Sequence, residues 1–236
     1  MPLPKTKHPK YTFEIPSTKK KASFRPFLVK EEKLLLMAKS SGQTQDIFLA
    51  IQQILNLCCL DAGFSVEKLT LFDMEYLFLK LHAVSVTNVI EVSYIDNEDK
   101  TMYNFKIDLN EVKMKWPENR DVKIETGTKT GLIMKYPSAS LYTDTEFLSN
   151  TKDSLFNLIV RCIESVYTET EIFPASDFTI EEVAEYVDDL DVKTFEKLTA
   201  FMLNQPTMYY KIEYKNSMGN DRAIELSTLS DFFVLA

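Results

Sequence analysis

The sequence predicts an α+β protein, and three observations lead to this prediction. Apolar side chains with helical spacing occupy much of residues 30–85. Apolar and polar residues alternate between residues 88 and 137, as they do in half-buried strands. The last hundred residues return to helical spacing and close with a hairpin pattern. With 236 residues, 45% of them apolar, the chain can bury a sizeable core.

The chain begins with a basic head that leads into a predicted hairpin. Tyr11, Phe13 and Ile15 alternate with polar residues, which is strand spacing, and residues 22–29 return after a turn. Pro26 cannot donate a hydrogen bond to a strand ladder, so it must lie at an edge or a bulge.

Three helices are expected next. Residues 30–39 consist of strong helix formers, and residues 43–60 carry apolar side chains at positions i, i+3, i+4 and i+7. Asp73 is expected to cap a third helix, whose apolar stripe runs from Met74 to Leu81.

The middle of the chain predicts antiparallel strands with one face exposed to water. Residues 103–109 and 112–116 alternate between apolar and polar side chains. Turn-forming residues gather at 96–99, 117–119 and 127–131, so each predicted strand is short.

Helices and a closing hairpin are expected in the remainder. An apolar stripe from Leu155 to Val166 predicts one helix. Thr179 and Glu182 have the spacing of a capping box, and Asp191 is expected to cap a further helix. The patterns of residues 208–214 and 222–226 predict the closing hairpin.

The domain organisation is predicted from one weak seam. Pro, Ser, Thr and Asp gather at residues 137–150. The seam divides the chain into an N-terminal helical and antiparallel β region, 1–137, and a C-terminal helical region with a terminal hairpin, 138–236. One continuous domain is the alternative.

Charge is unevenly spread along the chain. Residues 1–39 carry ten basic and three acidic residues, a net +7, whereas the whole chain carries −8. This head is either a solvated arm or a segment that docks electrostatically onto an acidic protein or nucleic acid. Residues 164–198 hold eleven acids and two bases, and form either a solvated face or a docking site for a basic partner.

Nucleic-acid binding by the head is less favoured. A basic stripe with interleaved aromatic side chains is typical of proteins that bind single strands. Here, however, Tyr11, Phe13 and Phe24 occupy alternating strand positions, which is typical of side chains that pack inward. The remaining −15 of the chain would also repel phosphate.

No catalytic, cofactor or metal site is expected from the residue inventory. Two histidines and three cysteines, scattered along the chain, are too few for the close-spaced pairs of a zinc site. Cys58, Cys59 and Cys162 fall in predicted apolar helices, where packed thiols are expected. His82 is expected to be a packed or a surface residue rather than a metal ligand. Nucleophile elbows, P-loops and dinucleotide fingerprints are absent from the sequence. We therefore expect a protein that is not an enzyme and has no cofactor.

The cysteine count and the lengths of the apolar runs predict the cellular compartment of the chain. An odd cysteine count with two adjacent thiols is not typical of a disulfide framework. The first ten residues lack the apolar core of a signal peptide, and no apolar run reaches the roughly 18 residues of a membrane span. We expect a soluble, reduced, cytoplasmic chain without membrane partners.

Two segments of the sequence resemble a known family. FRPFLVKEEKLLLMA at residues 24–38 and FDMEYLFLKLHAVSV at residues 72–86 resemble the baseplate hub assembly proteins of T-even-like contractile-tailed bacteriophages. That family includes a hub subunit and a related hub assembly catalyst. MKYPS at 134–138 and LSDFF at 229–233 add weaker similarity.

The resemblance implies a non-enzymatic role in building the central hub of a phage tail baseplate, as an assembly factor or as a minor hub component. Partners would be other hub and tail proteins or further copies of the chain. The location would be the host cytoplasm during assembly, or the baseplate of the virion. Two alternatives remain: a permanent structural protein of the virion, and a nucleic-acid-binding factor that uses the basic head.

Partner contacts are expected at the two similar segments and at the apolar end of the chain. The same side chains could instead cover the core of the chain itself. The candidate partner-binding residues are Phe24, Arg25, Pro26, Phe27, Leu28, Phe72, Tyr76, Phe232 and Phe233.

This chain departs from the family at two turns. Some members carry cysteine pairs in hairpins near the middle and the end, which is typical of small zinc ribbons. The corresponding turns here, at residues 96–100 and 216–221, contain no cysteine. A zinc role is therefore not implied, and cross-strand packing is expected to hold these hairpins.

Overall fold

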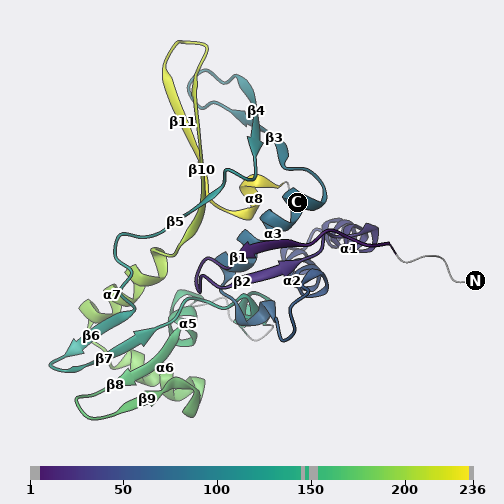
Figure 1. Cartoon of the computed structure of the whole chain (residues 1–236). Helices are drawn as coiled ribbons and strands as arrows, with labels where there is room; N and C mark the ends of the chain where they lie inside the picture. The colour runs from purple at the N-terminus through teal and green to yellow at the C-terminus, as the bar shows by residue number, and fades with distance from the viewer. Residues whose placement is uncertain (1–5, 145–146, 149–153, 234–236) are drawn as a thin grey trace, which may run out of the picture. The chain divides into compact units, whose positions relative to one another are not determined.

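A computed structural model describes residues 6–144, 147–148 and 154–233. The α+β prediction is confirmed, because helices and small antiparallel sheets build the chain (Figure 1). Contacts group it into two compact units. The first unit comprises Met1–Lys115 and Thr207–Ala236, and the second comprises Trp116–Pro206. The seam predicted at residue 137 thus lies within the second unit, and the closing hairpin belongs to the first.

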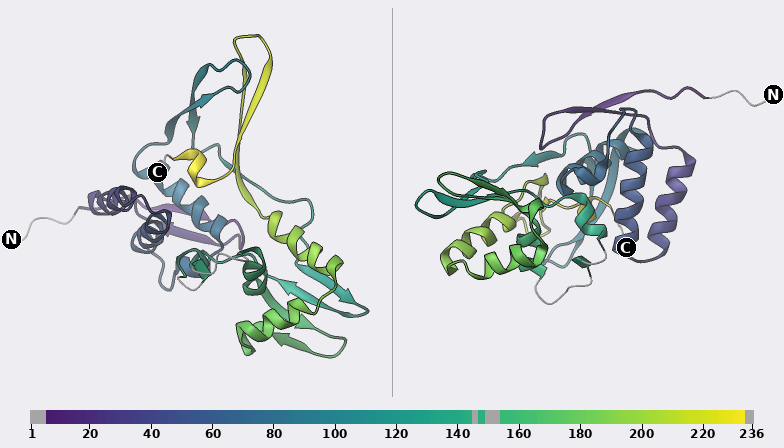
Figure 2. Two further views of the ribbon diagram at one scale, coloured as in Figure 1. Left: turned by 180° about the vertical axis from the view of Figure 1, so that it is seen from behind. Right: turned by 90° about the horizontal axis from the view of Figure 1, so that it is seen from below.

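A hairpin and three helices open the first unit. Their bounds are β1 Tyr11–Glu14, β2 Lys21–Phe24, α1 Val29–Ser40, α2 Thr44–Cys58 and α3 Leu71–Ser85, with a 3-10 turn at Val66–Lys68 before α3. α2 contacts both α1 and α3, so α1 forms the outer edge of this helical layer (Figure 2). The fully buried side chains that join these elements include Phe24, Ile51, Leu55, Met74 and Phe78.

The hairpin is tied to the helices by backbone and side-chain hydrogen bonds. The Leu60 amide donates to the Ser23 carbonyl at 2.7 Å, which joins β2 to the end of α2. Asp73 accepts bonds from the amide and the hydroxyl of Ser17 at 2.8 and 2.5 Å, which joins the hairpin turn to α3. Pro26 follows β2 rather than lying in it.

The expected role of Asp73 as the cap of α3 is wrong. The N-cap is Thr70, whose hydroxyl accepts a bond from the Asp73 amide, and the Asp73 carboxylate in turn accepts from the Thr70 amide. This reciprocal arrangement is a capping box, with Asp73 at its third helical position. The helix therefore begins three residues earlier than Asp73 suggests.

Two β-hairpins complete the first unit. β3 Val89–Ile95 pairs with β4 Met102–Asp108, and β10 Thr207–Lys215 pairs with β11 Asp221–Leu226. β5 Lys113–Lys115 adds to the start of β10, and the short helix α8 Leu229–Phe232 follows β11. The Lys80 ammonium donates to the carbonyls of Leu109, Asn110 and Val112, which anchors the connection between β4 and β5 to α3.

The second unit is a four-stranded antiparallel sheet with helices packed against it. The strands, in sheet order, are β6 Lys123–Gly127, β7 Thr130–Met134, β8 Ile163–Tyr167 and β9 Ile172–Pro174. The helices are α5 Ser154–Arg161, α6 Ile180–Asp188 and α7 Val192–Leu203, with 3-10 turns at Ala139–Thr143 and Ala175–Asp177. Leu132, Ile159, Cys162, Val187 and Leu198 form part of one buried apolar cluster that joins sheet and helices.

The stripe from Leu155 to Val166 is split between two elements, so the prediction of one helix there is wrong. α5 ends at Arg161, and the next residues form β8 between β7 and β9. Ile163 is buried and Glu164 exposed, which is strand alternation. The capping predictions for the following helices are confirmed: Thr179 and Glu182 form a capping box on α6, and Asp191 caps α7.

Candidate functional site at the joined hairpin turns

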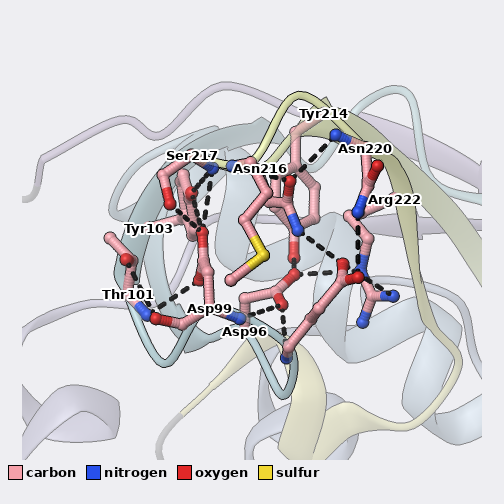
Figure 3. A network of polar contacts seen from close by, with 11 residues as sticks. Asp96, Asp99, Thr101, Tyr103, Tyr214, Asn216, Ser217, Asn220 and Arg222 are labelled. Atoms are coloured by element: carbon pink, nitrogen blue, oxygen red, sulfur yellow. Dashed lines mark hydrogen bonds and ion pairs between the residues drawn. The ribbon is translucent and has the colours of Figure 1, made fainter.

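The turns of the two hairpins in the first unit bind one another through polar side chains, of which Asp96 and Asn216 are buried (Figure 3). Asp96, directly after β3, is fully buried. Its Oδ2 accepts a hydrogen bond from the Tyr214 hydroxyl and another from Arg222 Nε, at 3.0 Å. Its Oδ1 accepts from the amides of Glu98 and Asp99 within the turn. One carboxylate therefore shapes its own turn and also binds the other hairpin.

Asp99 makes a second connection between the turns. Its carboxylate accepts hydrogen bonds from the Tyr103 hydroxyl at 2.6 Å and from the Thr101 amide at 2.8 Å. From the other hairpin, the Ser217 amide and hydroxyl donate to the same carboxylate at 2.9 and 2.7 Å.

Glu98 makes the third connection. Its two carboxylate oxygens accept from Asn216 Nδ2 at 2.6 Å and from Asn220 Nδ2 at 2.8 Å. Asn216 also organises its own turn, because its Oδ1 accepts from the amides of Met218 and Asn220. Three carboxylates of one turn are thus each held by donors of the other.

The donors keep the carboxylates of Asp96 and Asp99 ionised. At Asp96, the hydrogen bond from Tyr214 holds the pKa of the carboxyl below its usual range despite burial. Burial alone would raise the pKa of Asp99, but the bonds from Tyr103, Thr101 and Ser217 outweigh it and hold that pKa far lower. Burial and the bond to Asp96 raise the pKa of Tyr214 to about 12. Asp96, Asp99 and Tyr214 therefore each keep one protonation state at neutral pH, which suits a structural connection.

Aromatic packing lies beside this network. The Tyr214 ring lies 4.9 Å from the Tyr103 ring and 5.1 Å from the Phe105 ring, measured between centroids. These rings come from the inward faces of β10 and β4, so the two hairpins pack face to face. The two strands of each hairpin pair in antiparallel register. The polar link between the two turns was not predicted from the sequence. The turn sequences, DNEDK and NSMGN, are its visible signal.

The joined turns carry exposed apolar side chains. Ile95 and Met102 face each other in register across β3 and β4, and their exposed fractions are 55% and 60%. Met218, in the other turn, is 62% exposed. Ile95 and Met102 lie on the outer face of the β3–β4 hairpin, opposite the face that packs on Tyr214, and are called the tip surface. Large apolar side chains on a turn pair held by this many bonds form a preorganised contact surface.

The sequence matches the model of the T4 bacteriophage base plate protein family over residues 8–234. The chain belongs to this family. The match confirms the resemblance to phage baseplate proteins that the sequence indicates. A comparison with curated proteins and another with solved structures find no match. Membership of the family supports a structural or assembly role in the phage baseplate, in the virion tail or in the infected host, in contact with other baseplate proteins.

All nine candidate partner-binding residues of this base plate protein belong to its first unit. Phe24, Phe27, Phe72 and Phe232 are buried, with at most 8% of each exposed. The other five predicted partner-binding residues are partly buried: Arg25, Pro26, Leu28, Tyr76 and Phe233. The buried phenylalanines cover the core of the chain, so a partner could reach them only after their segments detached. Partner binding by these nine residues stays a prediction.

Arg25 has a structural role in the base plate protein. Its guanidinium forms an ion pair with Glu31 of α1 at 2.8 Å and donates to the carbonyls of Pro26 and Leu57. The Glu31 carboxylate also accepts from the Leu28 amide at the start of α1. These contacts hold the segment between β2 and α1 against α1 and α2.

The C-terminal segment packs onto α3. The Phe233 ring lies 4.6 Å from the His82 ring and 6.0 Å from the Phe78 ring. Burial raises the pKa of the Glu75 carboxyl to about 7. Burial lowers the pKa of His82 to about 4. Both groups lose solvation where α8 covers the helix.

The three cysteines are free thiols in this structure. Cys58 lies in α2, but Cys59 follows that helix and Cys162 lies between α5 and β8, so two of the three predicted helical placements are wrong. Burial raises the pKa of Cys58 to about 11 and that of Cys162 to about 12, which lowers the thiolate population.

Within residues 6–144, 147–148 and 154–233, no three His, Cys, Asp or Glu side chains are placed to share a metal ion. Among the helices of that same part of the chain, none combines the length and apolarity needed to cross a bilayer.

An open polar groove of about 840 Å³ lies in the second unit, beside the edge strand β6. Two backbone groups of β6 bond to side chains there: the Lys123 amide donates to Asp121, and the Glu125 carbonyl accepts from Lys197. Side chains that bond an edge strand protect it from pairing with another chain. The groove thus resembles a capped sheet edge more than a ligand pocket.

Proposed function

We propose that this base plate protein helps to build the central hub of the phage tail baseplate through protein contacts, without enzymatic chemistry. It acts either as an assembly factor or as a minor hub component. Family membership over residues 8–234 carries the proposal. The similarity of residues 24–38 and 72–86 to hub assembly proteins supports the hub in particular.

The tip surface is the contact we assign to this function. A flexible loop loses conformational freedom on binding, and that loss weakens a complex. The three carboxylates of the joined turns are bonded before any partner arrives, so the turn that carries Ile95 and Met102 is already ordered. Apolar anchors of this kind supply much of the binding energy in protein interfaces. We infer that the tip surface inserts into an apolar recess of a hub protein.

A tagged chain recovered from infected cells during tail assembly tests the proposal. Mass spectrometry should identify baseplate hub proteins in the recovered complex. Replacing both Ile95 and Met102 with serine should lower that recovery at least about tenfold. The matched control is Val192→Ser, which changes a side chain that is 74% exposed in the second unit and should recover as much as the unchanged chain.

Two results would overturn the proposal. Recovery of nucleic acid alone, or of no tail protein, would contradict the hub role. Equal loss of recovery in the tip variant and the Val192 control would contradict the assignment of the tip surface. Circular dichroism of each purified variant separates a lost contact from a lost fold.

Quantitative mass spectrometry of purified phage separates the two forms of the proposal. An assembly factor acts in the host cytoplasm and should be absent from finished particles. A minor hub component, or a permanent structural protein of the virion, should be present in a fixed ratio to other baseplate proteins.

Nucleic-acid binding by the basic head is the remaining alternative, and the structure supplies an argument against it. The Phe13 ring stacks on the buried Phe24 ring at 5.7 Å, so it is engaged within the hairpin rather than offered to a base. A labelled oligonucleotide tests this alternative directly. Retention by the unchanged chain, abolished by reversing the charges of Lys19, Lys20 and Lys21, would favour it.

A further inference from the structure

The outward face of α1 combines exposed apolar side chains with basic ones. Val29 and Met37 are 73% and 72% exposed, and Leu36 is 54% exposed. Lys30 and Lys33 lie on the same side of the helix, one turn apart, and are also exposed. The opposite side of α1, including Leu35 and Ala38, is buried where the helix packs on α2. Such a face on an outer helix has the composition of a docking surface.

α6, in the second unit, presents the complementary combination. Glu181, Glu185 and Asp188 are exposed and recur at i, i+4 and i+7, which forms one acidic stripe. Within the described part of the chain, none of these three carboxylates forms an ion pair. Phe178 and Ile180, at the beginning of the helix, are 46% and 38% exposed.

The two surfaces also belong to parts of the chain with opposite charge balance. Residues 116–206 carry 17 acidic and 8 basic residues, a net −9. The rest of the chain carries 18 acidic and 19 basic residues, a net +1, and its first 39 residues alone carry +7. Opposite fields of this kind steer two molecules together and fix their orientation.

We propose that α1 of one copy docks onto α6 of a second copy of this chain. Lys30 and Lys33, one turn apart, then face Glu181 and Glu185, which are also one turn apart. Val29, at the same end of α1 as Lys30, packs beside Phe178 and Ile180. A second copy is the expected partner because its α6 carries acidic side chains that complement the basic side chains of α1. The apolar residues at the start of α6 complement the apolar ones of α1. The contact joins two different surfaces, so each copy can bind a neighbour on either side.

Sedimentation equilibrium of the purified full chain tests the contact. The average mass should rise above the 27.3 kDa of one copy as concentration increases. Raising the salt from about 0.05 M to about 0.5 M should weaken the association at least about tenfold, because the charges involved are exposed. An average mass that stays at one copy over the whole concentration range overturns the proposal.

Charge reversal tests the pairing itself. K30E/K33E and E181K/E185K should each lower the association at least about tenfold. The chain with all four substitutions keeps the net charge of the unchanged protein and should associate again. An equal mixture of the two double variants should also associate, because each supplies the surface that the other lacks. K106E/K113E changes the net charge as K30E/K33E does, at exposed strand positions of the first unit, and should leave association unchanged.

Failure of the fourfold variant to recover association overturns the α1–α6 pairing, provided that its circular dichroism matches that of the unchanged chain. Loss of association in K106E/K113E overturns it as well, since the effect would then follow net charge alone. These measurements use the isolated chain, so a negative result leaves the proposed hub function standing.

Discussion

Replacing Glu31 with alanine should lower the free energy of unfolding of the first unit by about 3 kcal/mol. The Glu31 side chain is fully buried, and its carboxylate pairs with Arg25 at 2.8 Å. It also accepts the Leu28 amide at 2.8 Å, which satisfies one of the unpaired donors at the beginning of α1. Arg25 is one of the residues that the sequence marks for partner binding, so this substitution separates a structural role from a binding role.

The magnitude follows from the surroundings of the pair. Removing one partner of a buried ion pair costs roughly 3–5 kcal/mol, because the other charge stays buried without compensation. The Arg25 side chain is 15% exposed and keeps its bonds to two carbonyls, which places the cost at the low end. Glu31→Gln retains an acceptor for the Leu28 amide and should therefore cost less than the alanine substitution.

Urea unfolding followed by far-UV circular dichroism measures this cost. Glu91→Ala is the matched control: its ion pair with Lys106 is exposed, and its loss should change stability by about 0.5 kcal/mol at most. Burial raises the pKa of Glu31, but the bonds from Arg25 and Leu28 outweigh it and lower that pKa overall. The stabilisation is therefore complete above the ordinary carboxyl pKa and lost as pH falls through the lowered value. A loss below about 1 kcal/mol at neutral pH would refute the reasoning.

Two further predictions concern buried carboxyls of the first unit. Asp96→Asn places an amide donor among the donors of Tyr214 and Arg222. Amide hydrogens of the two turns should then exchange at least about tenfold faster, while those of α2 stay unchanged; unchanged turn exchange would contradict the account of the network. Glu75→Gln removes a carboxyl whose pKa rises from 4.5 to about 7 on folding. Wild-type stability should fall between those pH values, so the glutamine variant should gain about 3 kcal/mol relative to wild type between pH 5 and pH 8 in urea unfolding. A difference independent of pH would show that Glu75 does not titrate in this way.

Local patterns predicted many of the elements well. The alternation at Tyr11, Phe13 and Ile15, the helix formers of residues 30–39 and the capping box at Thr179 all match the structure. These signals act within a few residues, so they survive without knowledge of the remaining chain. The placement of the cap at Asp73 failed because Thr70 and Asp73 cap reciprocally, and the apolar stripe alone does not show which of them begins the helix.

At β8, pairing with β7 and β9 decided the structure against the local helical pattern of apolar residues. The residues after Arg161 continue an apolar helical stripe, yet Ile163–Tyr167 becomes a strand because β7 and β9 both pair with it. Backbone hydrogen bonds to two neighbouring strands outweigh a propensity difference of about 1 kcal/mol or less per residue.

The sequence by itself determined the α+β class, the basic head, the acidic region near α6 and the likeness to phage baseplate proteins. Only the tertiary structure decided which residues are available to partners. Phe24, Phe72, Ile95 and Met102 are all apolar, but the first two are buried and the last two are exposed. The link between Asp96 and Arg222 joins residues more than one hundred positions apart, so the polar turn sequences alone do not show that the two turns meet. Burial and long-range pairing depend on where the chain returns in space, and the fold alone supplies that information.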